Sequence, residues 1–205
     1  MSDEIVLTLR APLGAPVEAS TLALGHWREL GNAEIARRGV WVPGTGYVPL
    51  GELFHVEGER STRMRFVGDL SQLEGLGTGL DGAELVIEGD IGARVAARMR
   101  SGRVDVRGSA GWGAGLDMAG GLLEIYGNAG PRAGGAPLGA KRGMSGGEII
   151  VHGSAGAEAG ASMRRGLLVV RKDLGEGAGR ATIAGTIVAL GALGPNPGQW
   201  SKRGS

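Results

Sequence analysis

A sequence repeat with a period of about 19 runs from residue 61 to the C-terminus and limits the folds that this chain can adopt. Each copy contains a short alternation of apolar residues that ends at a reference position, and the spacings between consecutive reference positions are 21, 19, 19, 26, 19 and 19. These positions are Gly68, Gly89, Gly108, Gly127, Gly153, Lys172 and Gly191. One repeat of this length cannot bury its apolar side chains alone, whereas stacked repeats enclose a continuous core. The repeat therefore predicts a solenoid.

The apolar residues two and four positions before each reference position predict a strand in every copy, because they share one face at a period of two. The pattern predicts an all-β fold, namely a right-handed, single-stranded parallel β-helix of six to seven coils, since parallel crossovers are almost always right-handed. If equivalent residues stack, one column should contain Val106, Ile125, Val151 and Val170.

Composition agrees with strands rather than helices. Glycine makes up 42 of the 205 residues, and each glycine inside a helix costs about 1 kcal/mol relative to alanine. The chain has no cysteine, which excludes disulfides and thiolate metal sites. Four methionines occupy one position of the repeat, and they are interpreted as a column that fills the core. They are Met99, Met118, Met144 and Met163.

Residues 1–60 do not follow the repeat and are predicted to form a small α/β cap, while residues 61–205 form the β-helix. Within the cap we expect a strand over 4–10, one or two short helices over 18–38 and a strand over 50–56. The chain stops after a full coil without a recognisable cap. We therefore expect that a partner covers this end or that the chain is shortened.

Motifs that suggest chemistry do not fit the repeat. Residues 77–82 match the dinucleotide fingerprint G-x-G-x-x-G, but a strand follows them where the fingerprint requires a helix. Residues 143–147 match the nucleophile motif G-x-S-x-G, yet an equivalent copy carries alanine in the place of serine. The histidines His26, His55 and His152 lack the spacing of metal ligands. We therefore expect no catalytic residue and no metal site. Aromatic residues do not alternate with the basic ones, so no nucleic-acid partner is expected either.

Charge is distributed unevenly along the chain. Residues 1–93 carry 7 arginines and 14 acidic residues (net −7), whereas residues 94–205 carry 15 basic and 7 acidic residues (net +8). A seven-residue insertion within 130–143 interrupts the repeat, and insertions in solenoids map to loops on one face, often the binding face. A basic surface for a carboxylate-rich ligand or an acidic partner is predicted from Arg132, Lys141, Arg142, Arg164 and Arg165. An ordinary solvated loop is the alternative.

Two coils carry a resemblance to a known family. The segment Gly-Asn-Ala-Gly…Lys-Arg-Gly-Met-Ser-Gly-Gly and the following His-Gly-Ser-Ala-Gly-Ala-Glu-Ala-Gly-Ala-Ser-Met-Arg-Arg-Gly resemble the C-type subunit of formylmethanofuran dehydrogenase, and in particular its counterpart in the bacterial formyltransferase/hydrolase complex. The glutamate synthase large subunit shares the simpler G-x-G-x-x-x-G coil, so a structural or regulatory domain of that type is the alternative. In the family, the chain would continue past Lys202, Arg203 and Gly204 into a further strand and helix.

No apolar run is long enough for a membrane helix and the N-terminus does not resemble a signal peptide, so a cytoplasmic protein is expected. The resemblance implies a scaffold subunit without catalytic residues, in a complex of methanopterin-dependent one-carbon metabolism. Such a complex moves a formyl group between a methanofuran-type carrier and tetrahydromethanopterin. The implied partners are zinc-hydrolase-like, formyltransferase and accessory subunits, with the metal in another subunit and no membrane contact. The polyglutamate tail of the carrier would be the carboxylate-rich ligand of the basic surface.

Overall fold

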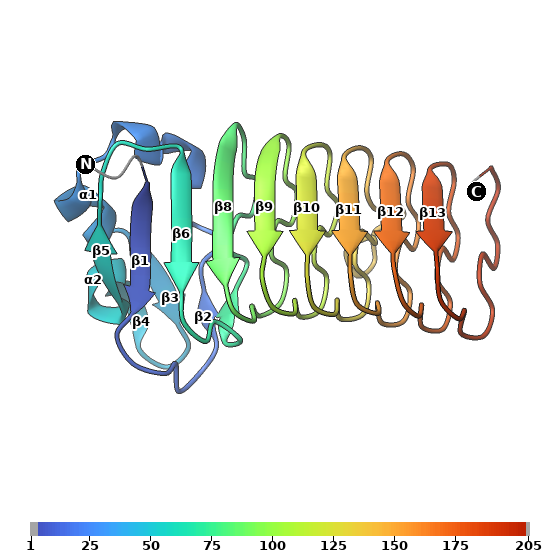
Figure 1. Ribbon diagram of the computed structural model, residues 1–205, viewed down its shortest axis with the longest axis horizontal. Coiled ribbons are helices and arrows are strands. Elements are labelled where there is room, and N and C mark those ends of the chain that lie inside the picture. Colours follow the sequence, from blue (N-terminus) through green and yellow to red (C-terminus); the bar gives the residue numbers. More distant parts are fainter. Residues whose placement is uncertain (1–3, 204–205) are drawn as a thin grey trace.

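The computed structural model describes residues 4–203, which contain two β-sheets (Figure 1). The nine-stranded sheet has the order β13-β12-β11-β10-β9-β8-β6-β1-β5, and the four-stranded sheet has the order β4-β3-β2-β7. The strands of the first sheet are β1 (Ile5–Leu9), β5 (Phe54–Glu57), β6 (Arg63–Val67), β8 (Ala83–Glu88), β9 (Gly102–Val106), β10 (Leu122–Ile125), β11 (Glu148–Val151), β12 (Leu167–Val170) and β13 (Thr186–Ala189).

The four-stranded sheet and the helices gather at the N-terminal end of the molecule (Figure 1). Its strands are β2 (Val17–Glu18), β3 (Gly39–Val42), β4 (Gly46–Pro49) and β7 (Leu73–Glu74). The helices are the 3-10 helix η1 (Leu24–Glu29) and the short α-helices α1 (Asn32–Ala36) and α2 (Leu50–Leu53). No helix among residues 4–203 has the length and hydropathy that crossing a membrane requires.

The expected right-handed, single-stranded parallel β-helix with a small α/β cap is wrong. The long sheet is mixed, because β1 pairs antiparallel with β5 while it pairs parallel with β6. Both β1 and β5 come from residues 1–60, so this segment extends the sheet of the repeats. From β9 onward, each repeat contributes only one strand, which belongs to the nine-stranded sheet. The turns of these repeats contain residues with positive φ at alternate positions, such as Gly113 and Gly115 (φ +71° and +63°). Such backbone cannot form an extended strand. The domain boundary at residue 60 stays a prediction.

The in-register stacking predicted from the repeat is confirmed. Ile125 pairs with Val106 on one side and with Val151 on the other, and Val151 pairs in turn with Val170. All four side chains are fully buried. The strands keep this register across the insertion, because Ala129 and Ala155 bridge although the insertion lies between them in the chain. Residues 137–142 lie in the additional loop.

The elements expected in the N-terminal segment are partly correct. The strand over 4–10 is confirmed as β1, and the helical segment over 18–38 is shorter than predicted, since residues 17–18 form β2. The strand over 50–56 is preceded by a helical turn, because Leu50–Leu53 forms α2 before β5 begins. Leu50 is fully buried, and its backbone N–H donates to Arg38 O at 2.7 Å, which ties this turn to the end of α1.

A ladder of polar side chains joins successive repeats along one edge. From Gly89 to Lys172, the residue after the reference position accepts a hydrogen bond from the backbone N–H of its equivalent in the next repeat. Short polar side chains can bond to backbone in this way, which explains why Asp, Ser or Asn recurs at this position. The successive members are Asp90, Ser109, Asn128, Ser154, Asp173 and finally Ala192, which only donates.

Candidate functional site

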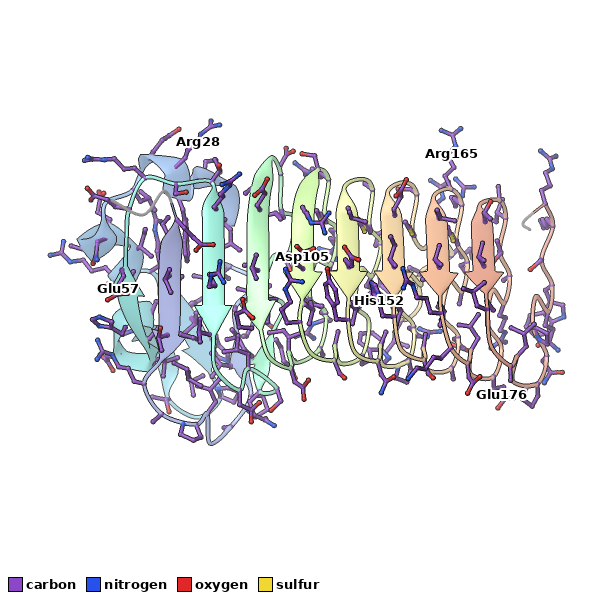
Figure 2. The ribbon with its side chains drawn as sticks, in the orientation of Figure 1. Arg28, Glu57, Asp105, His152, Arg165 and Glu176 are labelled. Atoms are coloured by element: carbon purple, nitrogen blue, oxygen red, sulfur yellow. The ribbon has the colours of Figure 1, made fainter. Side chains whose placement is uncertain are left out.

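Arg164 lies at one edge of the repeats, at the position directly after the methionine column. Arg164 N–H donates to Met144 O and Ser145 N–H donates to Met118 O, each at 2.8 Å. Arg164 therefore lies over Ser145 in the neighbouring repeat. Arg165 follows it and points away from the body of the protein (Figure 2). We refer to Arg164 and Arg165, together with the residues at the two equivalent positions of the other repeats, as the basic edge.

Arg164 and Arg165 line a shallow cavity of about 360 Å³, together with Ser145, Ile183 and Ala184. Arg165 is exposed and Arg164 is half-buried. The Arg164 Nε atom is shielded from solvent and has no hydrogen-bond acceptor among the described residues. Because a buried guanidinium N–H is costly without a partner, the cavity suits an anionic group such as a carboxylate.

Lys141 and Arg142 lie at the end of the insertion loop, and both are exposed. The loop rejoins the repeat at Gly143, whose N–H donates to Ser162 O at 2.9 Å. Ser162 is two positions before Arg164 in the chain. The fold thus brings Lys141 and Arg142 near residues 162–165, the segment that contributes Arg164 and Arg165 to the cavity.

Arg132 has a different environment from the other four predicted residues. Its Nε donates to Glu158 Oε2 at 2.6 Å, and Arg180 Nη1 donates to Glu158 Oε1 at 2.9 Å. The Arg180 guanidinium also lies over the Trp200 ring, 4.6 Å from its centroid. These residues line a separate cavity of about 250 Å³. Arg132 is therefore already paired with an acid.

Sequence reasoning missed three further members of the basic edge. Arg100 and Lys202 occupy the same repeat position as Arg164, because each donates its N–H to the equivalent carbonyl of the preceding repeat. Arg203 follows Lys202 as Arg165 follows Arg164. The repeat phase carried this signal, since the residue after Met99 is a cation just as the residue after Met163 is.

A second charged network lies on the outward face of the long sheet, over β9, β10 and β11 (Figure 2). Arg103 Nη2 lies 2.6 Å from Glu124 Oε2, and Glu124 Oε1 lies 2.8 Å from His152 Nε2. The His152 ring stacks on Tyr126 with centroids 4.7 Å apart. The hydrogen bond from His152 and the charge of Arg103 lower the pKa of Glu124. These contacts join adjacent strands, so the network is a stabilising element.

Within the described residues, no group of three or more His, Cys, Asp or Glu side chains is arranged to hold a metal ion. The predicted surface residues Lys141, Arg142, Arg164 and Arg165 are the ones that the structure leaves without an acidic side-chain partner in residues 4–203. They can attract carboxylates, while the Arg132–Glu158–Arg180 cluster is closer to electrical balance.

The ionisation of Glu158 should make the stability of the protein depend on pH, and this dependence tests the Arg132–Glu158–Arg180 cluster. The hydrogen bond from Arg132, followed by that from Arg180, lowers the pKa of Glu158. A carboxyl group whose pKa is lower in the folded state adds stability above its unfolded pKa of about 4.3, and this contribution is lost as the pH falls through the folded pKa. Glu158→Gln should cost on the order of 1 kcal/mol at pH 7, and the loss should shrink toward pH 3.

Thermal unfolding of the two proteins between pH 7 and pH 3 measures this difference. Glu57→Gln is the control, because Glu57 lies at the opposite end of the molecule and its side chain is mostly exposed (Figure 2). A constant difference between wild type and Glu158→Gln across this pH range would contradict the assignment.

Comparison with known proteins finds a likeness among the solved structures. No protein-family model matches the chain, and no curated protein matches it either. Among solved structures, it is similar to a chain of the formyltransferase/hydrolase complex from Methylorubrum extorquens, determined in complex with methylofuran. The two share 32% sequence identity with a TM-score of 0.90, and the match covers 98% of this chain and 77% of the other.

Proposed function

Because the chain belongs to the same family as the matched subunit of the formyltransferase/hydrolase complex, we propose that it is the non-catalytic scaffold subunit, of the C type, in such a complex. The complex would serve methanopterin-dependent one-carbon metabolism, with catalysis in the zinc-hydrolase-like and formyltransferase subunits. The observation that carries the proposal is the likeness over nearly the whole chain at 32% identity.

The repeats supply the rigidity that a scaffold needs. Consecutive strands of the long sheet from β6 to β13 pair with one another, and a line of bridges from Leu70 to Leu193 runs in parallel through the turns. Side chains therefore recur at regular intervals along one axis. A surface of this kind holds partner subunits at defined spacing.

Binding of the carboxylate-rich tail of a methanofuran-type carrier, or of an acidic subunit surface, is the role proposed for Arg164 and Arg165 of the basic edge together with Lys141 and Arg142 of the insertion loop. Support comes from the unpartnered Arg164 Nε and from the exposed cations Lys141, Arg142 and Arg165. The solved relative was determined with methylofuran. Single exposed ion pairs contribute only about 0–1 kcal/mol, so the four cations would act together. Arg132 was predicted together with these cations, but its guanidinium is paired with Glu158 and would attract a carboxylate less strongly.

Co-expression of this chain with the hydrolase and transferase subunits of the same organism tests the scaffold assignment. A tag on this chain should retain the hydrolase and transferase subunits in fixed stoichiometry through size-exclusion chromatography. Purification of this chain alone, with no subunit retained, would contradict the proposal.

Substitution of the four cations by alanine tests this binding role. The variant Lys141→Ala/Arg142→Ala/Arg164→Ala/Arg165→Ala should weaken retention of the carrier or of an acidic subunit by at least roughly tenfold, or ~1.4 kcal/mol. The difference from wild type should fall at high salt, because exposed charges are screened. The control Arg37→Ala/Arg38→Ala removes two exposed arginines at the other end of the molecule. Unchanged carrier retention and assembly in the fourfold variant would remove this role.

A further inference from the structure

A polar cavity of about 550 Å³ lies where the N-terminal segment meets the first repeats. Residues of η1 line one side of this cavity, and residues 78–82 line another. The two segments approach closely at Gly25, where a methyl group would lie 3.0 Å from Asp81 O. A methyl group at Gly82 would meet nothing within 4 Å, so this residue borders open space. The cavity is therefore bounded by two backbone segments that the fold holds together.

Cations predominate among the ionisable residues of this lining. The basic ones are His26, Arg28 and Arg100, and all three are exposed. Among residues 4–203, Arg28 has one acidic partner, Glu29 at 3.4 Å, and both side chains of this pair are mostly exposed. Such a pair is weak. The carboxylate of the lining, Asp81, already accepts a hydrogen bond from the Ser101 hydroxyl. The cavity therefore suits an anionic ligand.

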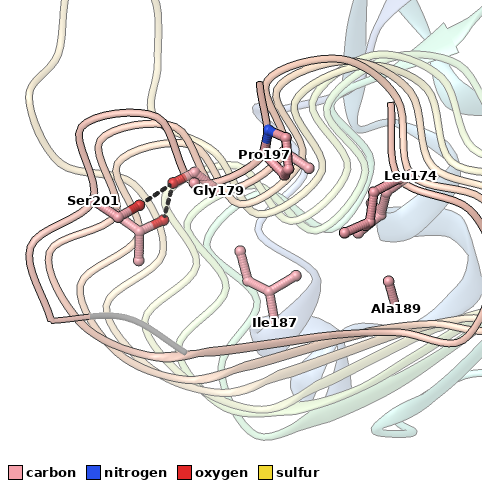
Figure 3. A pocket seen from close by; sticks show the side chains of 10 residues that line it. Leu174, Gly179, Ile187, Ala189, Pro197 and Ser201 are labelled. Atoms are coloured by element: carbon pink, nitrogen blue, oxygen red, sulfur yellow. Dashed lines mark hydrogen bonds between the residues drawn. The ribbon is translucent and has the colours of Figure 1, made fainter. Parts of the chain in front are cut away.

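The cavity beside β13 has a different character (Figure 3). It measures about 380 Å³, and no charged side chain belongs to its described lining. Ile187 and Pro197 line it, and the hydroxyl groups of Thr182 and Ser201 donate to one backbone carbonyl (Figure 3). This cavity does not suit an anion. The continuation of the family chain that is expected past Gly204 lies outside the described residues.

The polar cavity and the cavity at Arg164 lie on the same edge of the repeats. Arg100 occupies the basic-edge position of its repeat, and Ala119 and Ser145 occupy this position in the two repeats between it and Arg164. Neighbouring strands lie about 4.8 Å apart, so three steps separate the Arg100 and Arg164 backbones by about 14 Å. Arg28 and Arg165 lie along this same edge (Figure 2).

Small residues form the edge between the two groups of cations. None of these residues is buried, and their side chains extend no further than a hydroxyl group. They are Ala119, Gly120, Ser145 and Gly146. A ligand can therefore lie close to the backbone as it passes from one cavity to the other.

The side chains of the two cavities favour carboxylates over a nucleic acid. Neither cavity has an aromatic side chain in its described lining, whereas proteins that bind single-stranded nucleic acids stack the bases on aromatic rings. Guanidinium groups pair well with carboxylates, because their N–H groups match the two carboxylate oxygens. Two groups of cations in line suit several carboxylates on one extended chain.

From these observations we propose that the basic edge binds one extended chain of carboxylates, which runs from the cavity at His26, Arg28 and Arg100 to the cavity at Arg164 and Arg165. An extended chain advances about 3.4 Å per residue, so about four residues bridge the two cavities. Once one end is bound, binding of the other is intramolecular and raises the affinity. The proposal rests on the binding role proposed for Arg164 and Arg165. The chain is the tail of a carrier or an acidic segment of a partner subunit, which share this chemistry.

Titration calorimetry of the full chain with oligoglutamates of two lengths tests the double contact. Octaglutamate spans about 27 Å when extended and reaches both cavities, whereas triglutamate occupies one. Octaglutamate should bind at least roughly tenfold more tightly than triglutamate. The variant Arg28→Ala/Arg100→Ala should remove this advantage, while triglutamate, which still has the other cavity, should bind nearly as before.

The variant Arg37→Ala/Arg38→Ala is the matched control, because it also removes two exposed arginines. It should leave the binding of octaglutamate unchanged. An octaglutamate affinity that Arg28→Ala/Arg100→Ala does not lower overturns the proposal, as does an equal loss in the control. Tighter binding of an oligothymidylate with as many phosphates would overturn the choice of carboxylates.

The variant Ala119→Glu tests the path between the cavities. Ala119 is exposed, so the variant should fold normally. Its carboxylate should weaken octaglutamate binding by at least roughly fivefold, since like charges repel across a few ångströms. Triglutamate, which does not cross this position, should be affected much less. Ala33→Glu is the control, because Ala33 is exposed on α1. Undiminished octaglutamate binding by Ala119→Glu would show that the ligand does not follow this edge.

The assembled complex identifies the source of the chain. If Arg28→Ala/Arg100→Ala loses the carrier while all subunits are retained, the chain belongs to the carrier. If a subunit is lost, the chain belongs to that subunit. Retention of both overturns the proposal. If the fourfold variant described above also retains both, the binding role of Arg164 and Arg165 is wrong as well. If the fourfold variant alone loses one of them, only the second contact is wrong.

Discussion

Replacing Gly147 with alanine is expected to lower the free energy of unfolding by about 2–4 kcal/mol. Gly147 has a φ of +85°, a conformation that costs other residues roughly 1–2 kcal/mol. A methyl group on its Cα would lie 2.8 Å from Gly120 C and from Gly121 O in the preceding repeat. Backbone atoms held in a stacked layer cannot move apart locally, so overpacking adds to the strain.

Gly79→Ala is the matched control for this prediction. Gly79 also has a positive φ, of +68°, but a methyl group on its Cα would meet nothing within 4 Å. It should therefore show the conformational cost alone, about 1 kcal/mol. Urea-induced unfolding followed by circular dichroism gives both values. Equal destabilisation by the two substitutions would show that the repeats do not stack as tightly as the structure indicates.

Replacing Met144 with alanine is expected to destabilise the protein by about 2–5 kcal/mol, because it opens a cavity in a fully buried column. Met99, Met118 and Met163 occupy the same position of their repeats and are equally buried, as the repeat phase predicted. Met144 lies in the interior of this column, with a repeat on each side that restricts collapse around the cavity.

Met144→Leu distinguishes a packing role from one that needs sulfur. Leucine is apolar and of similar volume, so the variant should lose less than about 1.5 kcal/mol. The same urea measurement decides the question. A loss with leucine as large as with alanine would contradict the packing role and would favour a requirement for the thioether.

The candidate site was only partly visible in the sequence. The repeat phase placed Arg164 and Arg165 together, and the insertion pointed to Lys141 and Arg142. The pairing of Arg132 with Glu158 could not be seen, because the two residues lie in different repeats on either side of an insertion of irregular length. Ion pairs of this kind depend on which side chains the turns direct outward. Nor could the sequence show that Arg164 Nε is shielded without a partner in the described part of the chain.

By itself, the sequence determined the register of the repeats. Apolar residues at a period of two, recurring at the same phase of each repeat, leave one way to bury all of them, so Val106, Ile125, Val151 and Val170 had to stack. Only the tertiary structure decided how residues 1–60 complete the fold. β1 and β5 join the long sheet because their backbone groups pair although they are far apart in the chain, and no local pattern encodes a partner at that distance.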